Sequence, residues 1–329
     1  MSTTAPTTRT LPPTGSPTPP EAAGGLRGHV RRHPLLAFFV LAYGLSWLAW
    51  TPYVLSGNGL GLLPFSFPSL LGTTQLAGVL PGAYLGPVTA AFLVTALAEG
   101  RAGLRAWRGR LLRFRVRWTW WVGVALAVPV VIVLTTLLVP GALGQARAFP
   151  LSLLLAYVPM LALQVVTTAF AEEPGWRDFA LPRLQRARGP VLGTVILGLL
   201  WGGWHLPLFL SAWGDYPHAS PLQPVVFVAG CVPLSLVMTW VFNRTGQSVP
   251  LVMLLHASIN TTYTLVWPVM FPAVSAAGLG YTVQLVAASL VTVVLLVATR
   301  GRLGLQASRQ VSQGSEGGGA GGAGGAGGA

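Results

Sequence analysis

Eight apolar stretches dominate the chain, and each approaches the roughly 20 residues that a helix needs to cross a bilayer. They lie at residues 35–55, 75–98, 118–139, 150–171, 191–210, 222–242, 247–266 and 280–299. Only 8% of the residues are charged, whereas a soluble domain carries about 25%. So few charges cannot cover a water-soluble surface. We therefore predict an all-α, polytopic membrane bundle of about eight transmembrane helices.

The basic residues are all arginines, and they gather at alternate junctions between the predicted spans. Arg147 alone lies on the other side of the bundle. Because cytoplasmic loops collect Arg and Lys, we predict that both termini are cytoplasmic. The composition, which lacks lysine, suggests a GC-rich bacterial genome and hence a bacterial plasma membrane. The same topology explains the net charge of +13, so we expect a lipid bilayer and no nucleic acid as partner.

The two ends of the chain differ in composition from the middle. Residues 1–30 are rich in Thr, Pro, Ser and Gly, and residues 306–329 are mostly Gly and Ala. We predict that both are disordered tails without a catalytic role, which leaves residues 31–305 as the membrane domain. The single cysteine, Cys231, excludes an intramolecular disulfide.

Two of the seven acidic residues are neighbours, in the segment FAEEPGWRDF at the end of the fourth predicted span. Ionisable residues in a membrane are costly and mark functional sites by default. Glu172 and Glu173 point about 100° apart on a helix, so they should have different roles. Glu173 precedes Arg177 by four residues, the favourable order for an ion pair. Glu172 is left as a free carboxylate, suited to a general base, although a structural salt-bridge cluster is the alternative.

Two further polar clusters lie in later spans. His205 follows Trp201 by one helical turn, and His256 precedes Asn260 by one turn. Each cluster alone could be a satisfied core residue or a bridge between helices. Together with Glu172 they are most simply satisfied in one shared cavity. Such a cavity could activate water and stabilise an oxyanion, or bind zinc through Glu172, His205 and His256.

A shared cavity places a demand on the fourth helix. At 1.5 Å per residue, His205 lies about 21 Å inside the membrane from residue 191. The fourth helix must therefore continue past Glu173, with a kink at Pro174. Glu172 and His205 must then lie close together.

Three segments in this order, EEPGWRDFALPRLQ, WGGWHLP and HASIN, resemble the motifs of the CPBP family. This family comprises the CAAX-prenyl-protease-2-like, or Abi, intramembrane proteases. The motif core covers about residues 150–265, and the resemblance extends over roughly residues 30–300. The resemblance implies that residues 31–305 form a membrane protease domain.

The resemblance also implies roles for individual residues. Glu172 would activate the attacking water with His205 as its partner. His256 and Asn260 would stabilise the tetrahedral oxyanion. The supporting residues would be Glu173, Arg177 and Trp201.

The resemblance leaves two properties undecided, namely whether the protein uses a metal ion and which substrate it cleaves. The family is commonly labelled metalloprotease, so zinc is an expected cofactor, yet a metal-free glutamate mechanism has been argued for relatives. The HExxH motif is absent from the chain. Asp178 stands where many members have Gly, and it could compete for Arg177. As substrate we expect a membrane-embedded peptide or protein, without a claim of prenylation.

Two other functions compete with proteolysis. One is a non-catalytic membrane scaffold or bacteriocin-immunity protein, which would tolerate loss of the glutamates. The other is a transporter with a Glu/His relay, which needs a pore through both faces. A protease instead needs a one-ended cavity, which we expect to open to the cytoplasmic side or to the lipid.

Overall fold

The computed structural model describes residues 25–305, and within them it contains helices and no strand. In this part of the chain, eight helical segments are long and apolar enough to cross a membrane. They are Pro34–Leu55, Leu80–Ala98, Trp118–Thr136, Leu153–Arg188, Pro190–Leu210, Gln223–Arg244, Val249–Met270 and Gly280–Thr299. The predicted all-α, multi-pass membrane protein is confirmed.

The predicted tails fall almost entirely outside the described residues. Residues 25–30 are the exception, because helix α1 (Leu26–Arg32) begins within the segment 1–30 that was expected to be disordered. The tail at residues 306–329 lies outside the described part.

Four of the spans are single α-helices, and the other four combine shorter ones. The single helices are α2 (Pro34–Leu55), α7 (Trp118–Thr136), α13 (Gln223–Arg244) and α17 (Gly280–Thr299). The others contain α4 (Leu80–Ala83), α5 (Thr89–Ala98), α9 (Leu153–Gln164), α10 (Phe170–Glu173), α11 (Leu181–Arg188), α12 (Pro190–Trp204), α14 (Val249–Thr261) and α15 (Trp267–Met270). Short helices in the connections are α3 (Gln75–Gly78), α6 (Gly100–Leu111), α8 (Ala142–Gln145) and α16 (Pro272–Ala276).

The fourth span differs most from its predicted boundaries. It was expected to end at residue 171, but the helical run continues to Arg188. Pro174 has no N–H to donate, and the π-helical stretch η3 (Pro174–Ala180) begins there. The helix therefore does continue past Glu173, as a shared cavity requires.

Glycines set the close approach of α12 to α13. A Cβ on Gly198 would lie 2.7 Å from the Val232 Cα, and one on Gly202 would lie 3.0 Å from the Val228 Cα. Small residues allow membrane helices to pack backbone against backbone in this way. This packing fixes the position of the end of α12, where Trp201 and His205 lie.

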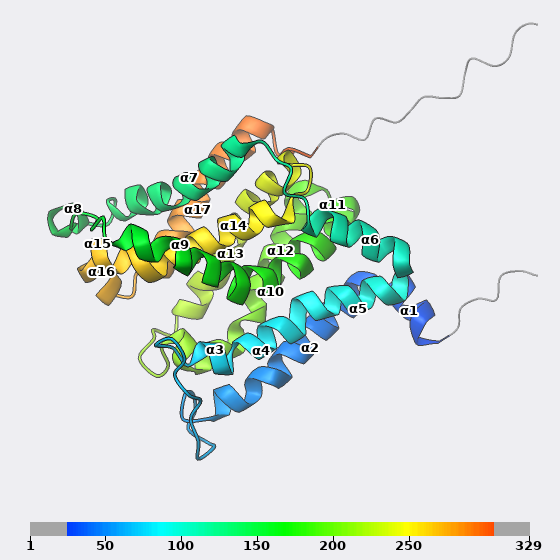
Figure 1. Cartoon of the computed structure of the whole chain (residues 1–329), viewed down its shortest axis with the longest axis horizontal. Helices are drawn as coiled ribbons and strands as arrows, with labels where there is room; N and C mark the ends of the chain where they lie inside the picture. Colours follow the sequence, from blue (N-terminus) through cyan, green and yellow to red (C-terminus); the bar gives the residue numbers. More distant parts are fainter. Residues whose placement is uncertain (1–24, 306–329) are drawn as a thin grey trace, which may run out of the picture.

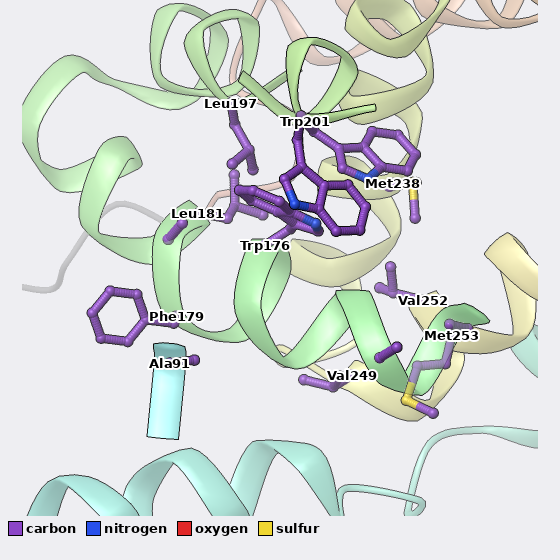
Figure 2. Packing of buried hydrophobic residues seen from close by; sticks show 14 of the residues in the cluster. Ala91, Trp176, Phe179, Leu181, Leu197, Trp201, Met238, Val249, Val252 and Met253 are labelled. Atoms are coloured by element: carbon purple, nitrogen blue, oxygen red, sulfur yellow. The ribbon is translucent and has the colours of Figure 1, made fainter. Parts of the chain in front are cut away.

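The main hydrophobic core surrounds η3 and the adjoining helices. Figure 2 shows part of this buried cluster, in which Trp176 and Phe179 from η3 join Leu197 and Trp201 from α12. All four side chains are buried. The segment that follows the two glutamates is therefore enclosed by packed side chains.

The bundle has two distinct ends (Figure 1). At one end lie α1, α6 and α11, and at the opposite end lie α3, α8, α15 and α16. Contacts at the first end include the Arg183–Glu99 ion pair and a hydrogen bond from Arg113 Nη1 to the Gly246 carbonyl, 2.5 Å long. We call this the arginine end, because nearly all of the exposed arginines of the described chain lie on connections that meet there.

Candidate active site

Glu172 lies on α10 and is buried, yet its side chain borders a cavity. Trp201 Nε1 donates a hydrogen bond to Glu172 Oε2 over 2.7 Å. His205 Nε2 lies 4.0 Å from the same carboxylate oxygen. Glu172 and His205 are therefore close together, as the hypothesis of a shared cavity requires. The distance exceeds that of a direct hydrogen bond and leaves space for an intervening group.

His205 is held in one orientation at the end of α12. Its Nδ1 lies 2.9 Å from the Trp201 carbonyl oxygen. A carbonyl can only accept, so Nδ1 carries the proton and Nε2 of the neutral ring is an acceptor. Trp204, Trp213 and Phe227 surround the ring, with centroid distances of 4.7, 5.5 and 5.0 Å. The aromatic surroundings and the backbone hydrogen bond together direct Nε2 to Glu172.

Glu173 faces a different set of partners from Glu172. Its Oε2 lies 3.3 Å from Arg177 Nε, the ion pair that the four-residue spacing predicts. Its Oε1 accepts a hydrogen bond from His256 Nδ1 over 2.7 Å. The Arg177 guanidinium also lies over the Trp201 ring, 4.1 Å from its centroid. Glu173 thus joins the fourth span to α14, a link that sequence spacing did not indicate.

His256 and Asn260 lie one turn apart on α14 and both border the cavity. Asn260 Nδ2 approaches Gln164 Oε1 at 3.5 Å, and Thr168 Oγ1 donates to the same oxygen over 2.9 Å. Gln164 was not predicted as part of the site. It precedes Glu172 by eight residues, close to two helical turns, and this spacing could have identified it.

Asp178 does not compete for Arg177, contrary to expectation. Its carboxylate instead forms an ion pair with Arg110 of α6. The Asp178 side chain is fully buried, whereas the Arg110 side chain is 21% exposed. The third acid therefore ties η3 to the amphipathic helix α6 and leaves Arg177 to Glu173.

One cavity of about 740 Å³ brings the predicted catalytic residues together. Glu172, His205, His256 and Asn260 all border it, and Trp201 does as well. Glu173 and Arg177 lie behind this wall, buried in the protein. The arrangement places two acceptors, Glu172 and His205, at one point and an amide donor, Asn260, on another wall.

A zinc ion would need the side chains of Glu172, His205 and His256 to converge on one point. In residues 25–305, no three His, Cys, Asp or Glu side chains lie close enough together to hold a metal ion. His205 and His256 each form a hydrogen bond through Nδ1, as metal-bound histidines do. Their side chains do not, however, come together with a third ligand in the described structure. As arranged here these residues do not fit a zinc site. Zinc binding through Glu172, His205 and His256 stays a prediction, and no step below uses a metal.

Comparison with known proteins finds similarity in the part of the chain that contains this site. Residues 154–262 match the family model described as Type II CAAX prenyl endopeptidase Rce1-like. The chain is also similar to a protein of Methanococcus maripaludis named CAAX prenyl protease 2, with 30% identity over 144 residues. That alignment covers 42% of this chain and 53% of the relative, so the chain spans about half the length of the relative that it matches. All of the predicted site residues lie inside the matched region.

Proposed function

The chain belongs to the CPBP family through its matched region, and from this premise we propose that it is an intramembrane endopeptidase. Its substrate would be a membrane-associated peptide or protein. The observation that carries the proposal is the buried Glu172 carboxylate beside His205 Nε2 at one cavity wall. We place the enzyme in a bacterial plasma membrane, as the lysine-free composition suggests. Both termini would be cytoplasmic, as the arginine distribution predicts.

The 4.0 Å separation between Glu172 and His205 suits a bridging water molecule. Such a water would donate one hydrogen bond to Glu172 and the other to His205 Nε2, since both atoms are acceptors. Its lone pairs would then be free to attack a peptide carbonyl carbon. Glu172 takes the proton of the water as general base. The hydrogen bond from Trp201 holds the carboxylate in position for this transfer.

The tetrahedral intermediate needs donors for its oxyanion. Asn260 has two amide hydrogens, of which one is directed to Gln164, so the other can donate to the oxyanion. His256 can donate from Nε2 only when doubly protonated, with its positive charge beside the Glu173 carboxylate. Collapse of the intermediate breaks the C–N bond, and Glu172 returns the proton to the leaving nitrogen. The same carboxylate, Glu172, therefore accepts the proton from water and later returns it.

Cleavage of a quenched peptide library by the purified protein tests the proposal. Glu172→Gln and His205→Ala should each lower kcat by about 10²–10⁴-fold, the usual contribution of a general base. His218→Ala is the matched control, because His218 is exposed and outside the cavity. Equal activity of all four proteins would contradict the assigned roles. Absence of cleavage by the wild type under every condition would favour the scaffold or immunity function.

The same preparation tests the other open assignments. Metal analysis of the wild type and His256→Ala would measure whether zinc is bound in a stoichiometric amount, and removal of zinc by a chelator should abolish cleavage if zinc is required. A transporter needs a pore through both faces, whereas in the described part of the chain no residue of the arginine-rich connections lines this cavity. That observation favours a hydrolase over a Glu/His relay.

A further inference from the structure

The cavity opens at the end of the bundle opposite to the arginine end. Its walls include Leu71 and Thr73 from the α2–α3 connection, Trp213 from the connection between α12 and α13, and Ser275 and Gly278 from around α16. Figure 1 shows α3 and α16 far from α6 and α11. In the described part of the chain, no residue of the arginine-rich connections lines the cavity.

The opposite end of the cavity is closed by packed side chains. Glu172 and Trp201 form its inner wall, and the helix then continues towards the arginine end through Trp176, Arg177 and Phe179. The last three are each fully buried, with 0% of their surface exposed. A substrate can therefore reach Glu172 from the end that holds Leu71 but has no open path from the arginine end.

We infer that the substrate of this protein approaches from the extracytoplasmic side, as an extended stretch of peptide without acidic side chains. The inference rests on the proposed function. Arginine-rich connections stay in the cytoplasm, so the arginine end is the cytoplasmic one and the cavity mouth faces outwards. We expected a protease cavity to open to the cytoplasmic side or to the lipid, whereas this inference places the mouth on the extracytoplasmic side.

The chemistry of the walls defines the substrate further. Between the mouth and Glu172, uncharged amide side chains border the cavity, namely those of Gln75, Gln164, Gln223, Gln284 and Asn260. Primary amides both donate and accept, as peptide groups do, so they can pair with an extended backbone. Tryptophan and tyrosine rings supply apolar surface between them.

The charges on the cavity wall exclude one class of peptide. Glu172 is the one carboxylate among the lining residues of the described chain, and no arginine accompanies it there. An acidic side chain or a free C-terminal carboxylate next to the scissile bond would face the Glu172 carboxylate, and among these lining residues only the histidines His205 and His256 could carry a compensating positive charge. The cavity therefore favours a bond in a segment without acidic side chains over a bond beside a free C-terminus.

Thiol labelling in intact cells tests the side of access without need of activity. Cys231 is the sole cysteine and is buried, so Cys231→Ala provides a cysteine-free background. Leu71→Cys places a thiol at the mouth, where the side chain is 80% exposed. Ala106→Cys, on an exposed position of α6, is the control at the arginine end. A membrane-impermeant maleimide should label Leu71→Cys in intact cells and Ala106→Cys only after permeabilisation. The reverse pattern would overturn the inferred side.

A peptide panel tests the substrate chemistry. A cleaved neutral peptide should lose at least 10-fold in kcat/KM when aspartate flanks the scissile bond, and likewise when that bond is moved next to a free C-terminus. Gln223→Arg adds a cation to the cavity wall and should raise kcat/KM for the acidic peptide several-fold. Equal cleavage of neutral and acidic peptides would overturn the inferred chemistry and leave proteolysis intact. If no peptide is cleaved, the proposed function falls, while the labelling result still decides the side of access.

Discussion

Glu172 and Glu173 are neighbours on α10, but their partners differ in charge. Glu173 contacts Arg177 and His256, whereas Glu172 contacts the neutral indole of Trp201 and lies near His205. Glu172 is thus available for chemistry at the cavity. Glu173 is a positioning residue, because it holds α14 and the fourth span in register.

This difference predicts that two matched substitutions change the stability of the protein to different extents. Glu173→Gln leaves the fully buried Arg177 without its counter-charge and should lower the free energy of unfolding by about 3–5 kcal/mol. Glu172→Gln retains an acceptor for Trp201 and should change that free energy by less than about 1 kcal/mol. Thermal unfolding in detergent measures both. Equal destabilisation would contradict the separation of roles.

Trp201 and Trp204 provide a second matched pair. Trp201 Nε1 donates to Glu172, whereas Trp204 Nε1 has no hydrogen-bond partner in the described part of the chain. A hydrogen bond to a charged group contributes about 1.5–3 kcal/mol, so Trp201→Phe should reduce kcat by about 10- to 100-fold. Trp204→Phe removes the same ring portion and should retain most of the activity. Comparable losses in both variants would indicate a packing effect in place of a hydrogen bond.

At the scale of the helices, the packing of α12 on α13 determines where His205 lies. Gly198→Ala would drive a Cβ to within 2.7 Å of the Val232 backbone and should cost at least about 1–3 kcal/mol of stability. Activity should fall as well, since α12 carries Trp201 and His205. Gly44→Ala is the control, because nothing lies within 4 Å of the added Cβ. Thermal unfolding and peptide cleavage of both variants check the prediction.

The link between α6 and η3 can be tested by rescue. Arg110→Met leaves the buried Asp178 carboxylate unpaired and should lower the free energy of unfolding by roughly 1–3 kcal/mol. Asp178→Asn in the same protein removes the unpaired charge and should recover part of that loss. Unfolding of the single and double variants supplies the coupling between the two positions. An unchanged stability of Arg110→Met would show that the pair is not a structural link.

At the scale of the whole molecule, the arginine end predicts the orientation in the membrane. A fluorescent protein fused after Arg302 should be fluorescent, and alkaline phosphatase fused at the same point should be inactive, because both would be cytoplasmic. Alkaline phosphatase fused after Ala146, between the third and fourth spans, should be active. Activity in the reverse combination would invert the topology and, with it, the inferred side of substrate access.

Much of this architecture follows from the sequence alone, for a physical reason. Span number depends on apolar length, and the predicted orientation depends on the arginine count of each connection, so both can be assessed along the chain. The ion pair of Glu173 with Arg177 and the shared face of His256 and Asn260 depend on helical spacing within one segment. These features were all predictable without tertiary structure.

Tertiary packing decided the rest, because it joins residues that are far apart in the sequence. The partners of Glu172, Glu173 and Asp178 on other helices are 29, 83 and 68 residues away, respectively. The end at which the cavity opens depends likewise on how the connections between helices pack. Asp178 shows the limit most clearly, since the resemblance to the family suggested only that it could compete for Arg177, and the docking of α6 supplied Arg110 as its partner. The sequence thus determined which residues are chemically competent, and helix packing determined which of them meet and from which side a substrate can reach them.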